Sequence, residues 1–94
     1  MREVSSFNPE KYRDNPKRIA EYLNVALATD DTAVIVKAIG DMLRTQGVAR
    51  ISEKSGLRRE GLYRSFEGHR VPGFDTVLRV LLALDVRIVT KPRG

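Results

Sequence analysis

Five arginines lie within residues 47–74 of this 94-residue chain, in a stretch that reads GVARISEKSGLRREGLYRSFEGHRVPGF. A guanidinium group can donate paired hydrogen bonds to phosphate oxygens or to the edge of a guanine, and a tyrosine hydroxyl can bond to the sugar–phosphate backbone. The stretch therefore favours a surface that binds double-stranded DNA. We expect that surface to consist of Arg50, Arg58, Arg59, Glu60, Tyr63, Arg64, His69 and Arg70.

Two short helices must position these side chains. The pattern predicts helices over 48–55 and 58–66, separated by a turn at Gly56, because glycine adopts a positive φ without steric cost. Ser52 is small enough to let the two helices approach, and the apolar residues expected on their inner faces are Ile51, Leu57, Leu62 and Phe66. This is the pattern of a helix-turn-helix. The alternative is a solvated helical hairpin, in which Glu60 and Arg64 form an ordinary ion pair one turn apart.

The charge distribution agrees with a nucleic-acid partner. Residues 1–43 contain six Lys/Arg and seven Asp/Glu, a net charge of −1, whereas residues 44–94 contain eleven and five, a net charge of +6. All of the excess positive charge is therefore in the half that contains the arginine-rich stretch. A basic half indicates binding to nucleic acid or to an acidic protein surface.

Several function classes are disfavoured by what the chain contains. It has no cysteine and a single histidine, so no disulfide framework and no zinc site are expected. Its carboxylates show no paired arrangement, and we expect neither enzymatic activity nor a cofactor. The N-terminus lacks the apolar region of a secretory signal, and the longest apolar run is far too short to span a membrane. A cytoplasmic location is expected.

Three further helices complete an all-α domain of five helices. The first begins at Pro16 with Asn15 as its N-cap, and the second covers residues 32–46, capped by Asp30 or Asp31 and ended by Gly47. Gly40 lies inside the second helix, which suggests that another helix crosses closely there. The last helix spans 74–84, and Val86, Ile88 and Thr90 predict a short C-terminal strand that pairs with another strand or another chain.

The apolar faces of these helices follow from three- and four-residue spacing. On the first helix the stripe is Ile19, Tyr22, Leu23, Ala26 and Leu27, and on the second it is Ile35, Ile39, Met42 and Leu43. On the last helix we expect Phe74, Val77, Leu78, Leu81 and Leu84 on the inner side, with Val80 and Leu82 widening the stripe. So wide a stripe fits a central core helix or a helix that also meets a partner subunit.

Residues 35–86 resemble the Xre/λ-repressor-like helix-turn-helix family. The segment after the arginine-rich helix matches that family without a gap at Gly68, Arg70, Pro72, Asp75, Thr76, Leu78, Ala83, Leu84 and Val86. The resemblance implies a λ-repressor-like DNA-binding fold. Four positions depart from the usual pattern: Arg58 and Gly73 replace N-cap residues, Ser65 replaces a buried aliphatic residue, and Val48 replaces a phosphate-binding glutamine.

Over nearly its whole length, the chain also resembles the addiction-module antidote proteins, small antitoxins with this repressor fold. The resemblance is carried by the segments FNPEKY, IAEYLNVAL, AIGD and SGLRREGLY. It implies that the protein neutralises a RelE/ParE-like toxin and binds its own operator as a homodimeric repressor. Residues 1–30 are then expected to form an arm and helix that contact the toxin through Phe7, Tyr12 and Tyr22, and residues 31–94 to form the DNA-binding domain with its C-terminal strand. The alternative is a stand-alone phage-type regulator without a toxin.

Overall fold

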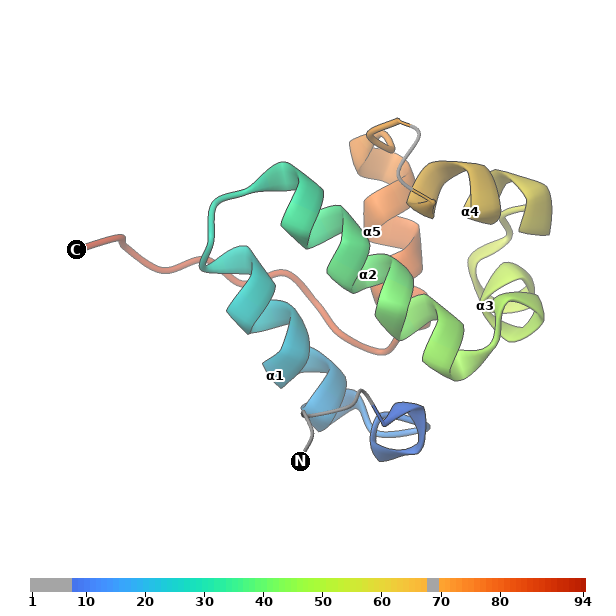
Figure 1. Cartoon of the computed structure of the whole chain (residues 1–94), viewed down its shortest axis with the longest axis horizontal. Helices are drawn as coiled ribbons and strands as arrows, with labels where there is room; N and C mark the ends of the chain where they lie inside the picture. Colours follow the sequence, from blue (N-terminus) through green and yellow to red (C-terminus); the bar gives the residue numbers. More distant parts are fainter. Residues whose placement is uncertain (1–7, 68–69) are drawn as a thin grey trace, which may run out of the picture.

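The computed structural model describes residues 8–67 and 70–94, and within them helices are the only regular secondary structure (Figure 1). A short 3-10 helix, η1 (Pro9–Lys11), precedes the α-helices. These are α1 (Pro16–Leu27), α2 (Thr32–Gln46), α3 (Val48–Ser55), α4 (Arg59–Phe66) and α5 (Phe74–Ala83). The prediction of an all-α domain of five helices is confirmed, and none of these helices is long and apolar enough to cross a membrane.

The helix boundaries follow from local capping chemistry. Asn15 caps α1, because its side-chain oxygen accepts a hydrogen bond from the Arg18 N–H. Asp31, rather than Asp30, caps α2 by accepting from the N–H groups of Ala33 and Val34. Gly47 ends α2 with φ at 94°. The sequence therefore predicts these boundaries to the residue.

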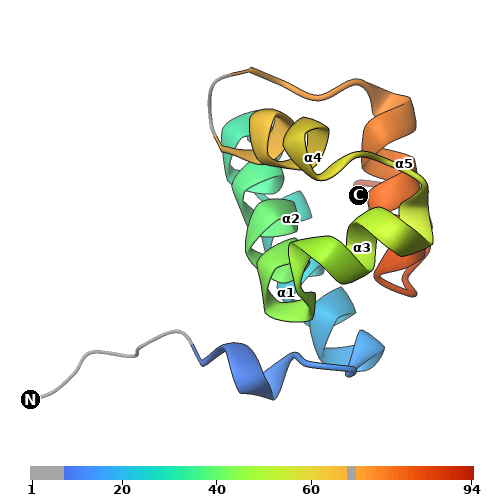
Figure 2. The ribbon, with the colours of Figure 1, turned by 90° about the vertical axis from the view of Figure 1, so that its right-hand side faces the viewer.

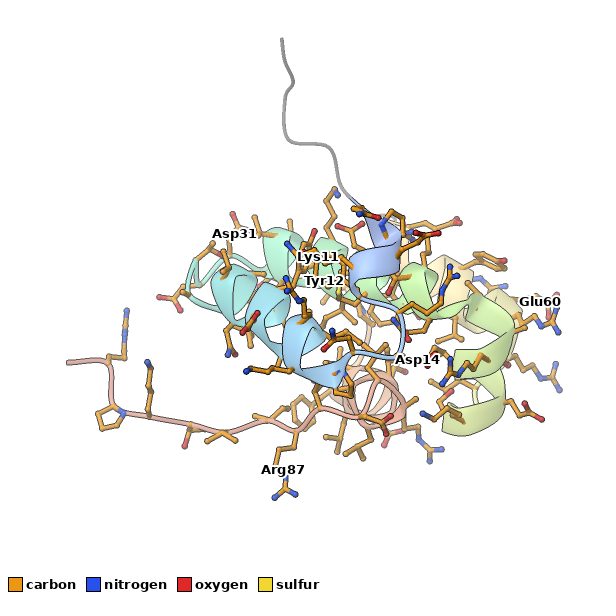
Figure 3. The ribbon with its side chains drawn as sticks, turned by 90° about the horizontal axis from the view of Figure 1, so that it is seen from below. Lys11, Tyr12, Asp14, Asp31, Glu60 and Arg87 are labelled. Atoms are coloured by element: carbon orange, nitrogen blue, oxygen red, sulfur yellow. The ribbon has the colours of Figure 1, made fainter. Side chains whose placement is uncertain are left out.

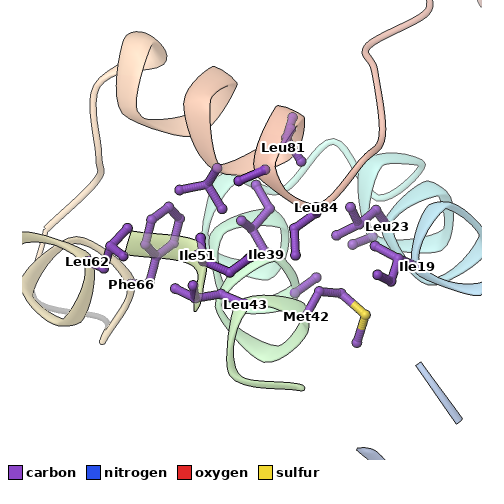
Figure 4. Close-up of a cluster of buried hydrophobic side chains, with 14 residues drawn as sticks. Ile19, Leu23, Ile39, Met42, Leu43, Ile51, Leu62, Phe66, Leu81 and Leu84 are labelled. Carbon is purple, nitrogen blue, oxygen red and sulfur yellow. The ribbon is translucent and has the colours of Figure 1, made fainter. Parts of the chain in front are cut away.

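A single core joins all five helices around α2, which packs against each of the other four (Figures 1 and 4). Its largest side chains with almost no exposure are Ile19, Met42, Leu43, Ile51, Leu62 and Val80. A Cβ atom on Gly40 would lie 3.1 Å from the Phe66 carbonyl oxygen, which confirms the close crossing expected there. Because Ile19 of α1 is buried in the same core as Leu62 of α4, α1 is part of the same packed unit as α4.

The inner side of α5 differs from the prediction. Phe74 is 69% exposed, whereas Val80, expected only to widen the stripe, is completely buried. The buried residues of α5 all lie in its C-terminal half, and its first turn leaves Phe74 in solvent. On α1, Leu27 was likewise expected in the core, but it lies at the last position of the helix and is 50% exposed.

The predicted C-terminal strand is not formed within the single chain: residues 86–94, the tail, run as an extended segment without strand pairing, and no strand occurs in the described ranges. The last backbone N–H of the chain to form a described hydrogen bond is that of Val86, which donates to the Leu81 carbonyl at 3.1 Å. A strand needs a neighbouring strand to accept its backbone hydrogen bonds, and an all-helical chain offers none.

Candidate functional site

The turn between α3 and α4 is fixed by a small set of hydrogen bonds. Gly56 adopts the left-handed conformation expected of it, with φ at 78°, and its N–H bonds to the Ser52 carbonyl at 3.0 Å. The Ser52 hydroxyl donates across the turn to the Leu57 carbonyl, and the Leu57 N–H donates to the Ser55 hydroxyl at 3.1 Å. Ser52 therefore closes the turn as a hydrogen-bond donor in addition to being small.

Two buried side chains hold α4 against the domain. Leu62 is completely buried and Phe66 is 3% exposed, so both inner-face predictions for this helix are confirmed. Ser65, between them in the sequence, is only half-buried. Since both anchors are buried, the opposite face of α4 is turned toward solvent, and α4 lies at the surface of the domain (Figure 2).

That outer face carries the predicted DNA-binding side chains. Arg58, Arg59, Glu60, Tyr63 and Arg64 are all exposed. Among the described residues, none of the three arginines takes part in an ion pair, and the Glu60–Arg64 pair weighed as the alternative is not formed. Figure 3 places Glu60 at the edge of the domain remote from the C-terminal tail. The structure thus groups five of the eight predicted residues on one surface.

The other three predicted residues are placed differently. Arg50, on α3, forms an ion pair with Asp14 at 2.6 Å and lines a hollow of about 220 Å³ between α3, the start of α1 and the end of α5. Arg70 is exposed in the loop after α4, beside a second hollow of about 580 Å³. His69 lies outside the described residues. Arg50 is therefore already neutralised by the N-terminal segment, unlike the arginines of α4.

Three aspartates with left-handed backbone conformations each pair with a cation. Asp14, Asp30 and Asp85 have φ values of 53°, 57° and 64°, a region that aspartate tolerates better than most residues. Their respective partners are Arg50, Arg93 and Lys54. These turn aspartates connect the N-terminal segment and the tail to the helices, and nothing in the local sequence pattern predicts the pairings.

A groove of about 530 Å³ opens on another face, between η1, α1 and α2. Tyr12 and Tyr22 line it, with ring centroids 5.3 Å apart in an edge-to-face arrangement, so the structure brings these two predicted toxin-binding residues together. Phe7, the third, lies outside the described residues. Sequence reasoning missed Val25 and Val34, which line the same groove and are 73% and 41% exposed. The sequence could have indicated them, because both are apolar residues that lie outside the predicted buried stripes.

Asp41 organises the polar side of this groove. It accepts a hydrogen bond from the Tyr22 hydroxyl at 2.9 Å and pairs with Lys37 at 3.2 Å and Arg44 at 3.1 Å. Burial raises the pKa of Tyr22 to about 12, and the hydrogen bond to Asp41 and its negative charge act in the same direction. The Tyr22 hydroxyl consequently stays protonated and keeps donating to Asp41.

The segment before α1 is fastened to the C-terminal end of α2. Gln46 accepts a hydrogen bond from the Asp14 N–H at 3.0 Å and donates to the Tyr12 carbonyl at 2.8 Å. The Arg13 guanidinium donates to the Thr45 carbonyl at 3.5 Å. These contacts fix the backbone that carries Tyr12, and with it one wall of the groove (Figure 3).

Within the described part of the chain, no group of three or more His, Cys, Asp or Glu residues is arranged to hold a metal ion. The described functional features are therefore an outward-facing cationic helix and an apolar groove.

Comparison with known proteins shows the family to which the chain belongs. Residues 3–92 match a family described as "Probable addiction module antidote protein". The chain belongs to this family. It is also 32% identical over 85 residues to an uncharacterised protein of Haemophilus influenzae, an alignment that covers 90% of this chain and 88% of that protein. No solved structure matches the chain.

Two helix starts of this antidote-family chain lack side-chain caps, as the sequence indicates. Arg58 at the start of α4 and Gly73 at the start of α5 make no capping hydrogen bond. The first N–H groups of α4 are consequently available to an external acceptor, beside the guanidinium groups of Arg58 and Arg59. A helix N-terminus in such surroundings favours anions.

Proposed function

We propose that this antidote-family protein is the antitoxin of a type II toxin–antitoxin module, which neutralises a small basic RelE/ParE-like toxin and represses its own promoter as a homodimer. The family match over residues 3–92 supports a toxin partner in general. In this proposal the protein acts in the cytoplasm and works by binding rather than by catalysis.

For the promoter-binding activity, the observation that carries the proposal is the outer face of α4. Tyr63 and three arginines are exposed there, and no described residue forms an ion pair with these arginines, while Leu62 and Phe66 hold the helix from behind. In a λ-repressor-like helix-turn-helix, α4 enters the major groove and the uncapped N–H groups at its start meet a phosphate. A two-fold dimer then spaces the two α4 helices about 34 Å apart, one turn of DNA.

An electrophoretic shift assay on the protein's own promoter tests this activity. The Arg59→Ala variant is expected to weaken specific binding by about 1–3 kcal/mol, because Arg59 lies free on the outer face of α4. Arg87→Ala is the matched control: it removes the same charge from the tail, where Arg87 points away from the domain (Figure 3). Equal binding by both variants would remove Arg59 from the interface.

For the toxin-neutralising activity, the groove between η1, α1 and α2 offers the surface. The half-buried Tyr12 and Tyr22 and the exposed Val25 and Val34 form an apolar strip with charged residues at its rim. An apolar patch bordered by charges is typical of a protein-binding site. The groove lies apart from α4, so one molecule could engage toxin and operator together.

Point variants test the groove better than a truncation, because deleting residues 1–30 would remove Ile19 and Leu23 from the core. Val25→Glu places a charge in the groove and is expected to abolish rescue when the antitoxin is co-expressed with the toxin. Asn24→Glu is the control: it adds the same charge at the neighbouring exposed position of α1, outside the groove. Loss of rescue by the control, or full rescue by Val25→Glu, would place the toxin elsewhere.

A further inference from the structure

The C-terminal tail, residues 86–94, is an extended segment whose backbone bonding capacity is unused. Beyond the Val86 N–H, no described backbone or side-chain group bonds to a tail N–H. Apolar side chains are exposed on it, Ile88 at 46% and Val89 at 79%. Among the described residues, the tail forms one ion pair, between Arg93 and Asp30 at 3.5 Å, and both groups are largely exposed. A segment rich in β-branched residues with free N–H and C=O groups is a template for strand pairing.

The direction of the tail separates it from the α4 surface. It leaves the end of α5, and its last residue lies on the opposite side of the molecule from α3 and α4 (Figure 1). Its cations are therefore not placed to add to the arginines of α4 on the same stretch of DNA. A protein strand is the partner that suits its free backbone groups.

The two faces of the tail differ. Val86 is half-buried against the core, and Ile88, two residues on, is less exposed than Val89. Arg87 points away from the domain (Figure 3). In an extended chain, alternate side chains share a face, so Val86, Ile88 and Thr90 face one way and Arg87, Val89 and Lys91 the other.

Charge restricts how two such tails can pair around a two-fold axis. In a symmetric antiparallel pair one residue lies opposite its own copy, and like charges placed directly opposite are destabilising. If the two copies of Val89 lie opposite each other, Arg87 of one copy lies opposite Lys91 of the other. If the two copies of Arg87, or the two copies of Thr90, lie opposite each other, two cations are again directly opposed. If the two copies of Ile88 lie opposite each other, no two cations are directly opposed. Val86 then lies opposite Thr90 of the other copy, and Arg87 lies opposite Val89. At each end, Lys91 lies opposite Asp85 of the other copy.

From this complementarity we infer that two copies of the protein associate through their tails, as an antiparallel pair of strands centred on Ile88. The pair places apolar and β-branched residues together on one face, and at each end it brings Lys91 to Asp85, which also pairs with Lys54 of its own chain at 3.3 Å. It satisfies backbone groups that the single chain leaves free. The inference rests on the proposed homodimer and identifies its interface.

Disulfide trapping tests the register, because the native chain has no cysteine. In this pairing the Cα atoms of the two Ile88 residues are about 4.5–5.5 Å apart, within disulfide range. The two Val89 residues are diagonal neighbours about 7–8 Å apart, beyond that range. The Ile88→Cys variant is therefore expected to form a covalent dimer on mild oxidation, and Val89→Cys, the matched control, to remain largely uncrosslinked.

Charge reversal tests the interface without cysteine. Lys91→Glu opposes Asp85 of the other copy and is expected to raise the dimer dissociation constant about tenfold in sedimentation, since two ion pairs become repulsive. Arg87→Glu makes the same change of charge opposite the uncharged Val89, where no ion pair is lost, and is expected not to raise the constant.

The outcomes separate this inference from the proposed function. If the native protein sediments as a dimer, but Ile88→Cys is not trapped more readily than Val89→Cys or Lys91→Glu dimerises normally, the tail interface is wrong and the homodimer stands. If the native protein is a monomer at concentrations that shift its promoter, the homodimer and the tail interface are both wrong. A trapped Ile88→Cys dimer together with weakened Lys91→Glu association establishes the interface.

Discussion

Two neighbouring residues of α4 should separate folding from DNA binding. Leu62 is completely buried and Tyr63 is 46% exposed. Truncating a fully buried leucine to alanine costs about 2–5 kcal/mol, because transfer free energy is lost and a cavity remains. A domain of this length is stable by roughly 5–14 kcal/mol. The Leu62→Ala variant should therefore lose about 3 kcal/mol, and its melting temperature should fall by roughly 12–24 °C.

Tyr63→Ala should show the opposite behaviour. Its side chain lies on the outer face, so unfolding stability should change by no more than about 0.5 kcal/mol. Promoter binding should nevertheless weaken about tenfold if the hydroxyl and ring contact DNA. The assays are urea unfolding followed by circular dichroism, and an electrophoretic shift at fixed salt concentration. A large loss of stability in Tyr63→Ala, or a loss below about 1 kcal/mol in Leu62→Ala, would refute the assignment of the two faces of α4.

The remaining predictions concern pH and the turn. Because the pKa of Tyr22 is raised from 10.0 to about 12, its protonated hydroxyl contributes stability that is fully present below pH 10 and is lost as the pH rises through 12. Tyr22→Phe should therefore flatten the decline of unfolding free energy over that pH range, and an unchanged slope would exclude Tyr22 as its cause. Gly56→Ala should cost about 1 kcal/mol, because φ is 78° there although nothing crowds the added methyl group closer than 3.8 Å. Gly61→Ala, in open space within α4, should instead gain up to about 1 kcal/mol; the same sign for both in thermal unfolding would contradict the backbone argument.

Local chemistry explains why so much of the helical framework is predictable. Asn15, Asp31 and Gly47 act within a few residues of their own positions, and periodic apolar spacing identifies Leu62 and Phe66 as anchors of α4. These signals do not depend on how the chain packs over long range.

The features that could not be predicted depend on contacts distant in sequence. The ion pair of Arg50 joins α3 to the segment before α1, and the exposure of Phe74 depends on where α5 meets α2 and α3. The groove needs η1, α1 and α2 to be in place before Val25 and Val34 become neighbours. The predicted C-terminal strand is not formed in the single chain for a related reason, because strand propensity cannot supply a partner strand.

Growth rescue in a co-expression experiment tests the antitoxin proposal most directly. The toxin candidate is the product of the reading frame immediately upstream of this chain's gene, expressed alone or with the native protein, with Arg59→Ala or with Val25→Glu. We expect the upstream product alone to arrest growth, the native protein and Arg59→Ala to restore it, and Val25→Glu to fail. An upstream product that does not arrest growth, or an arrest that the native protein does not relieve, would contradict the proposal that this protein is the antitoxin of that pair.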